Sequence, residues 1–117
     1  MKKLCAAFAA AFLFVVVAPA MAAEVTGELV DQACYMKDKT NVGATHQECA
    51  VTCAKKGQTV ALVTDTGDVV VVAGNMTANN NARLVPHMGH KVVMVGSLGV
   101  ENGKRAIYAS GLKMLSK

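Results

Sequence analysis

Aromatic residues are scarce in this sequence, which has no tryptophan, two tyrosines and three phenylalanines among 117 residues. Beyond residue 22 only Tyr35 and Tyr108 remain, and the net charge of +4 falls to +2 without Lys2 and Lys3. Proteins that bind single-stranded nucleic acids stack bases on aromatic side chains along a basic groove. The shortage of both features argues against a nucleic-acid partner.

The sequence also has no apolar run of the roughly twenty residues that a membrane-spanning helix needs. The longest run, Leu4–Ala18, follows two lysines and precedes the small-residue pattern Ala20-Met21-Ala22. This order predicts a secretory signal peptide over residues 1–22, with cleavage before Ala23. An uncleaved anchor is the alternative, for which the run is short. We therefore expect bacterial export to the periplasm or medium, with no membrane anchor after cleavage.

Common catalytic patterns are missing. There is no Ser-His-Asp order, no phosphate-cradling glycine loop and no close pair of carboxylates. The C-x-x-C pair of thioredoxin-like enzymes and the C-x-x-C-H pattern of covalent haem attachment are absent as well. These absences lead us to expect a binding protein rather than an enzyme.

What remains, residues 23–117, has the length of one small domain that is rich in β-strands. We expect strands over residues 24–34, 59–64, 69–73, 90–100 and 105–115. We expect a loop over 35–44, a helix over about 45–56 that stops at Gly57, and a short helix over about 77–85 before Pro86. An Asn-Gly turn, Glu101–Lys104, should join the last two strands as a hairpin.

Five strands, with a short helix after the first and a helical segment between the third and fourth, favour a mainly β fold. The order is that of a small Greek-key barrel of the oligonucleotide/oligosaccharide-binding (OB) type. Gly27, Gly96 and Gly111 lie within strands, where such a barrel must bend sharply. An open sheet or a sandwich with the same strands is the alternative.

The chain resembles a group of small uncharacterised exported bacterial proteins with an OB-type β-barrel. The resemblance covers nearly all of residues 24–117. It depends on a first strand ending at a cysteine, the motif H-x-x-C-A-x-x-C, then a glycine and a β-hairpin. Its most specific part is "HQECAVTC", His46 to Cys53. The resemblance implies a fold and a compartment but no biochemical activity.

Three cysteines and one histidine form the main candidate site: Cys34, His46, Cys49 and Cys53. A capping box from Thr45 to Glu48 would begin a helix here. At about 100° per residue, His46, Cys49 and Cys53 then share a sector of roughly 60° on the helix surface. Cys34, upstream, would approach this stripe from the end of the first strand. Asp31 and Glu48 are the only acids near these cysteines in the sequence.

Three interpretations of this cluster stay open. A Cys3His set suits Zn²⁺ and, with fewer ligands, Cu(I). Export instead favours a structural disulfide from Cys34 to Cys49 or Cys53, with one thiol left over. The third is a redox-active thiol. A metal ion, or an unidentified small ligand or protein, is accordingly the expected partner, and Zn²⁺ or Cu(I) the expected cofactor if there is one.

A second cluster of soft ligands occurs in "PHMGH", where His87, Met88 and His90 lie close together. Imidazole and thioether groups together suit copper. The alternative is that the histidines flank an exposed turn while Met88 fills the end of the core. The sequence thus predicts an exported, non-enzymatic binding module with one or two cysteine and histidine sites, and a metal-free ligand-binding module or a thiol redox protein as alternatives.

Overall fold

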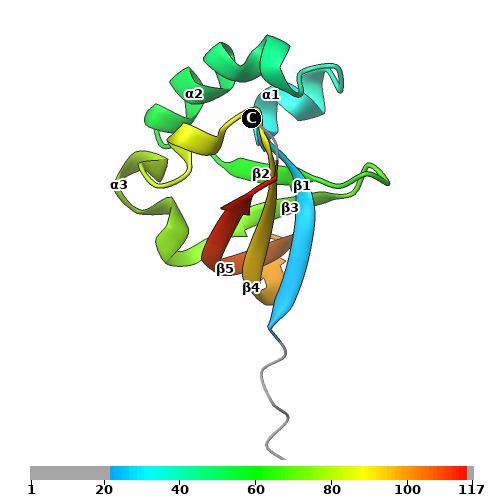
Figure 1. The fold of residues 1–117 in the computed structure, drawn as a ribbon, viewed down its shortest axis with the longest axis vertical. Helices are drawn as coiled ribbons and strands as arrows, with labels where there is room; N and C mark the ends of the chain where they lie inside the picture. Colours follow the sequence, from blue (N-terminus) through cyan, green and yellow to red (C-terminus); the bar gives the residue numbers. More distant parts are fainter. Residues whose placement is uncertain (1–21, 116–117) are drawn as a thin grey trace, which may run out of the picture.

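The computed structural model describes residues 22–115 (Figure 1). The predicted signal peptide lies outside the described residues except for Ala22. The five strands are β1 (Ala23–Asp31), β2 (Val60–Val63), β3 (Val69–Ala73), β4 (Lys91–Glu101) and β5 (Lys104–Met114). The three α-helices are α1 (Gln32–Lys37), α2 (Gln47–Lys55) and α3 (Ala78–Asn81). Three short 3-10 helices are η1 (Ala44–His46), η2 (Gly74–Thr77) and η3 (Val85–His87). None of the helices in this part of the chain has the length and apolar content needed to cross a membrane.

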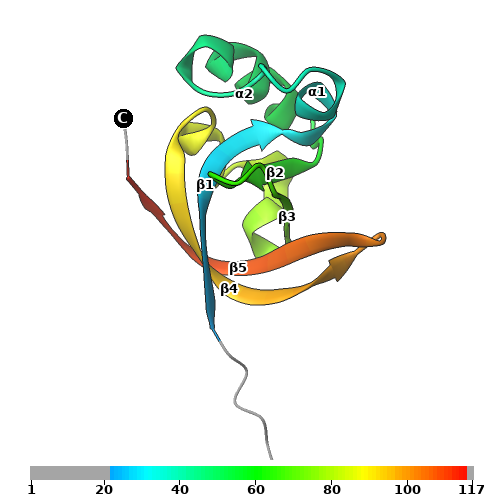
Figure 2. The same cartoon turned by 90° about the vertical axis from the view of Figure 1, so that its right-hand side faces the viewer.

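The strands form one mixed sheet that closes into a ring in the order β1-β2-β3-β5-β4 (Figure 2). Neighbouring strands are antiparallel except β3 and β5, which run parallel. β1 closes the ring because its two halves have different partners. Residues 28–31 pair with β2, whereas residues 23–28 pair with β4. The predicted mainly β fold with five strands is therefore confirmed.

Two glycines allow the strands to bend where the ring closes. A Cβ atom on Gly27 would lie 2.6 Å from the backbone oxygen of Val63, so the backbones of β1 and β2 approach closely there. A Cβ atom on Gly96 would overlap the carbonyl oxygen of Tyr108. The register of β4 against β5 also shifts between Val95 and Gly96, which is a β-bulge. The predicted bend at Gly96 coincides with this bulge, whereas a Cβ atom on Gly111, the third glycine of the prediction, would meet nothing within 4 Å.

The hydrophobic core fills the interior of the ring. Its largest members include the fully buried side chains of Leu29, Leu62, Leu84, Met94 and Ile107. Strands supply these side chains except Leu84, which lies between α3 and η3, and successive side chains of a strand point to opposite faces. Helix α2 covers one end of the ring and adds its alanine face, Ala50 and Ala54, to the same core (Figure 1).

The predicted element boundaries need two corrections before α2. The first strand ends at Asp31 rather than Cys34, and α1 occupies residues that were expected to be loop or strand. The cause is local: Asp31 is the N-cap of α1, and its carboxylate accepts a backbone N–H of the first turn. A helix of six residues is too short for hydrophobic periodicity to reveal it.

The helix expected over residues 77–85 is replaced by η2, α3 and η3, three short pieces. Asn79, Asn80 and Asn81 have φ values of 56°, 54° and 59°, which interrupt a right-handed helix. Asparagine adopts this left-handed conformation more readily than most residues. The buried amide of Asn81 donates 2.9 Å hydrogen bonds to the backbone oxygens of Ala54 and Gln58. The asparagine run thus ties the α3 segment to the end of α2.

Candidate metal centre

Asp31 positions the first cysteine of the cluster. The backbone N–H of Cys34 donates a hydrogen bond of 3.1 Å to Oδ2 of Asp31. Asp31 itself pairs with Val60 of β2, so the sheet fixes its place. Cys34 consequently lies in the first turn of α1, directly after the sheet.

Helix α2 supplies the other three predicted ligands, but it begins differently from the prediction. His46 is its N-cap, and no side-chain hydrogen bond caps the helix, so the predicted capping box from Thr45 to Glu48 is wrong. The reason is the preceding 3-10 helix η1, in which the N–H of His46 donates to the oxygen of Gly43 at 3.2 Å. Thr45 therefore lies inside that turn instead of at the helix start.

The far end of α2 follows the prediction. Gly57 has a φ of 82°, and its N–H donates to the oxygen of Ala54 at 2.9 Å. The N–H of Gln58 donates to the oxygen of Cys53 at 3.3 Å. This pair of bonds is the Schellman arrangement, in which a glycine ends a helix. Cys53 is thereby held in the last turn of a well-terminated helix.

The four predicted ligands converge in two overlapping groups. The donor atoms of Cys34, His46 and Cys49 all lie within 4.8 Å of one another. Those of Asp31, Cys34 and Cys53 form a second group that meets the same limit. We call these the outer and the inner triad; Cys34 belongs to both. The prediction that Cys34 approaches the stripe on α2 is confirmed, although it does so from α1.

Burial differs between the two triads. Cys49 is exposed, whereas Cys34, His46 and Cys53 are partly buried and Asp31 is buried. Two buried polar atoms among these residues, Nε2 of His46 and Oδ1 of Asp31, have no hydrogen-bond partner. Buried polar atoms are nearly always paired, so unpaired ones require an explanation such as an ion. Both of these atoms belong to residues of the triads.

The pKa values of the two thiols in the inner triad, Cys34 and Cys53, are raised. A side-chain hydrogen bond with Asp31 raises the pKa of Cys34 to about 12, and burial and the charges of Asp31 and the other two cysteines act in the same direction. Burial is the main cause that raises the pKa of Cys53, with the charge of Asp31 next. Without a cation these thiols therefore stay neutral at ordinary pH. A bound metal ion would displace their protons, as it does at other thiolate sites.

The disulfide interpretation does not agree with the structure. Cys34, Cys49 and Cys53, the three cysteines in the described residues, are all free thiols. A pair between Cys49 and Cys53 would in any case be strained, because positions four apart on a helix hold their Cβ atoms too far apart. The disulfide bond expected between Cys34 and the helix is therefore absent, and the three cysteines form a cluster of thiols.

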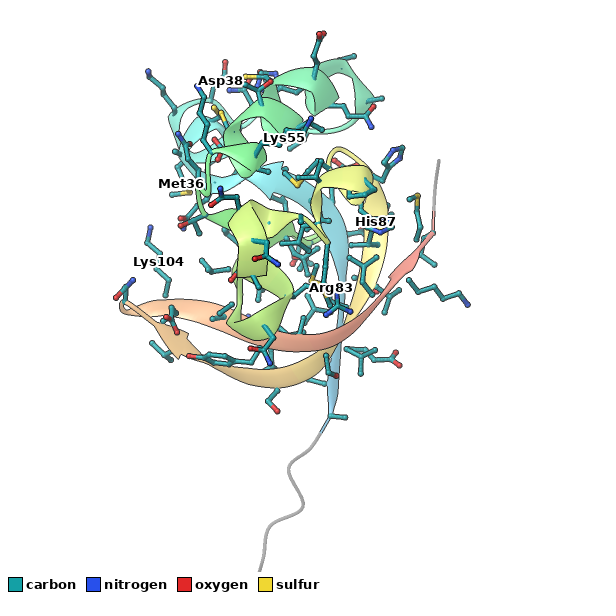
Figure 3. All side chains as sticks on the ribbon, turned by 90° about the vertical axis from the view of Figure 1, so that its left-hand side faces the viewer. Met36, Asp38, Lys55, Arg83, His87 and Lys104 are labelled. Carbon is teal, nitrogen blue, oxygen red and sulfur yellow. The ribbon has the colours of Figure 1, made fainter. Side chains whose placement is uncertain are left out.

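The second soft-ligand cluster is divided between the core and the surface. Met88 is fully buried in the main core, which places its thioether among apolar side chains. The side-chain amide of Gln47 donates a hydrogen bond of 3.1 Å to Nε2 of His90. Nδ1 of His87 is buried and has no hydrogen-bond partner. Burial lowers the pKa of His87, and the nearby His90 acts in the same direction. In Figure 3, His87 lies across the molecule from Met36 of α1.

Sequence reasoning missed a pocket of about 360 Å³ on the ring. It lies between the start of α1, strands β2 and β3, the α3 segment and the β4–β5 hairpin. Its polar lining includes Gln32, Asn80, Glu101 and Lys104. These residues are far apart in the chain, so only the strand order brings them together. The side-chain nitrogen of Gln32 is buried and unpaired.

From the sequence alone, Asp31 is recognisable only as an acid near the cysteines. Its spacing of three residues before Cys34 is the spacing between an N-cap carboxylate and the N–H that it accepts. This spacing could have predicted the start of α1 and the proximity of the Asp31 carboxylate to Cys34. Its burial and its distance to Cys53 depend on the fold and have no local signal.

Comparison of the chain with protein-family models, with curated proteins and with solved structures found no match. The functional argument therefore depends on the geometry of the cluster.

Proposed function

We propose that the protein is a small exported, non-enzymatic module that holds one Zn²⁺ or Cu(I) ion through Cys34, His46, Cys49 and Cys53. The observation that carries this proposal is the convergence of the donor atoms of these residues and Asp31 in two triads, each spanning less than 4.8 Å. Distances of this size allow small side-chain movements to bring the atoms onto one ion. Thiolate and imidazole are the preferred ligands of both metals.

Three further features support a metal over the other interpretations of the cluster. The described cysteines are free, which leaves all three sulfurs available. The buried Nε2 of His46 lacks a partner and would gain one by coordination. The raised pKa values of Cys34 and Cys53 argue against a redox-active thiol, since such enzymes need a stabilised thiolate.

The proposal includes a fold and a compartment. The strand order β1-β2-β3-β5-β4, with a helical segment between β3 and β4, supports an OB-type barrel. The lysines, apolar run and small residues of the first 22 positions support export with cleavage before Ala23. Kinship with the small exported bacterial proteins that share the cysteine motif belongs to the same proposal.

The test is metal loading of purified, reduced protein with Zn²⁺ or Cu(I), followed by gel filtration and elemental analysis. We expect about one ion per chain for the native protein. His46→Ala should weaken binding, whereas His87→Ala, a histidine change outside the cluster, should leave it unchanged. Native protein without bound metal would contradict the proposal. If only His87→Ala lost metal, the site would lie at the second cluster.

The polar pocket favours a second candidate function, the binding of a small polar molecule without metal. Its lining offers one carboxylate, Glu101, and one ammonium group, Lys104, beside the unpaired amide of Gln32. Such a set suits a zwitterion such as a free amino acid. Titration with a mixture of amino acids, followed by amide NMR shifts at Gln32 and Lys104, tests it. Saturable shifts that Lys104→Ala removes would support this function, and unchanged spectra would reject it.

A further inference from the structure

Asp31 is an unusual carboxylate in this protein. It is only 2% exposed, and it ranks among the fully buried side chains. One of its oxygens, Oδ2, accepts the N–H of Cys34, but Oδ1 has no hydrogen-bond partner. A buried polar atom without a partner loses its hydration and gains nothing in return. A fold that retains such an atom requires a compensating interaction.

The neighbours of Asp31 indicate what could compensate this oxygen. A carboxylate oxygen of Asp31 and the sulfurs of Cys34 and Cys53 lie within 4.8 Å of one another. Asp31 is thus a member of the inner triad and not merely a neighbour of it. This oxygen and the two sulfurs share the sulfur of Cys34 with the outer triad of Cys34, His46 and Cys49.

We propose that Oδ1 of Asp31 is a metal ligand and that it makes the resident ion Zn²⁺ instead of Cu(I). This inference rests on the proposed function, because it concerns a further ligand of the same ion.

Ligand preference supports zinc. Zn²⁺ accepts sulfur, nitrogen and carboxylate oxygen as ligands, and its coordination can expand from four to five. Cu(I) is a soft ion that prefers thiolate and thioether, and a carboxylate adds little to its binding. A site designed for Cu(I) would gain nothing from placing a buried carboxylate beside its sulfurs.

Charge supports the same choice. The three thiols, once ionised, and the carboxylate of Asp31 together carry four negative charges. A divalent ion leaves two of them uncompensated, whereas a monovalent ion leaves three. Uncompensated charge is costly in a partly buried site, so the divalent ion is favoured.

The helix cap and the metal need not compete for Asp31. Oδ2 can keep the N–H of Cys34 while the unpaired Oδ1 remains available to an ion. Asparagine is as good an N-cap as aspartate. Asp31→Asn therefore preserves the cap and removes the charged ligand, which makes it the informative variant.

The experiment measures the affinity of native protein and Asp31→Asn for Zn²⁺ and for Cu(I), each by competition with a chromophoric chelator. Asp65→Asn, which removes an exposed carboxylate in the β2–β3 turn, is the matched control. We expect Asp31→Asn to bind Zn²⁺ at least about tenfold more weakly. Its affinity for Cu(I) should stay within about twofold of native, and so should both affinities of the control.

Melting temperatures of the apo and zinc-loaded forms separate a ligand role from a capping role. Asp31→Asn should melt at or above the native temperature without metal, since a buried charge is removed. Zinc should raise its melting temperature less than that of native protein. Unchanged zinc affinity in a folded variant, or equal losses for zinc and copper, would overturn the inference and leave the proposed function standing. Native protein that binds neither metal would contradict the proposed function itself.

Discussion

The carboxylate of Asp31 accepts the backbone N–H of Cys34 at 3.1 Å, so the residue that ends β1 also fixes the first sulfur of the cluster. This contact joins the sheet to the candidate metal centre. Any movement of α1 would move Cys34 away from His46, Cys49 and Cys53 together. The geometry of the site therefore depends on a single local cap.

The first prediction concerns thiol reactivity in metal-free, reduced protein. At pH 8, iodoacetamide should modify the exposed Cys49 first and Cys34 last. Asp31 holds the pKa of Cys34 near 12, which leaves only roughly one thiol in ten thousand ionised at that pH. Peptide mass spectrometry over a time course gives the order.

Asp31→Asn should speed the modification of Cys34, because it removes the carboxylate that stabilises the protonated thiol. Asp65→Asn should not. Labelling of Cys34 as fast as Cys49 in native protein would show that the thiol is not held by the carboxylate.

A second prediction concerns Asn81, whose amide bonds the backbone oxygens of Ala54 and Gln58. Asn81→Ala should lower the free energy of unfolding by about 1–3 kcal/mol, because the oxygen of Gln58 loses this donor and that of Ala54 keeps the N–H of Gly57. Asn79→Ala is the control, since Asn79 has a similar positive φ but is exposed. Urea unfolding measures both. Equal losses in the two variants would assign the effect to backbone conformation alone.

Third, Gly96→Ala should destabilise the fold by about 3 kcal/mol, because the new Cβ overlaps the carbonyl oxygen of Tyr108 at the bulge. Gly111→Ala should cost far less, since a Cβ there meets nothing within 4 Å. Thermal unfolding of both variants checks the difference. A Gly96 variant as stable as the Gly111 variant would mean that the strands do not approach at the bulge as described.

Fourth, the phenol of Tyr108 donates a hydrogen bond to Oε2 of Glu101 across the β4–β5 hairpin. This bond raises the pKa of Tyr108 above its ordinary value, because ionisation would lose the bond and place two negative charges together. The neutral phenol should therefore persist to higher pH. Ultraviolet titration in a Tyr35→Phe background, which leaves one tyrosine, gives the value.

In the same background Glu101→Gln should lower the pKa of Tyr108 toward its ordinary value. Asp65→Asn, which removes a carboxylate in the β2–β3 turn, should leave it unaltered. Identical titration curves with and without Glu101 would show that the hydrogen bond does not form in solution.

Much of the fold follows from local patterns in the sequence. The strand at residues 69–73 was predicted without error, and the Asn-Gly turn after Glu101 has the positive φ values that a tight hairpin requires. The helix that carries Cys49 and Cys53 was predicted, and so was its end at Gly57, although His46 precedes this helix. These features depend on residues close together in the chain, so short-range rules suffice.

The remaining features depend on contacts between distant residues. Helix α1 is too short to show a periodic pattern, and the left-handed turn at Asn79–Asn81 depends on the bonds of Asn81 to the end of α2. The place of Asp31 within 4.8 Å of Cys34 and Cys53 arises from its pairing with β2 and the packing of α2. No local signal contains that information.

The most direct test of the central claim is native mass spectrometry of purified, reduced protein reconstituted with Zn²⁺. Cys34 belongs to both triads, so native protein should carry one zinc ion and Cys34→Ser should carry none under the same conditions. Ser110→Ala, a change on β5 outside the cluster, should keep its ion. Absence of zinc from native protein, or an equally tight ion in Cys34→Ser, would contradict the account.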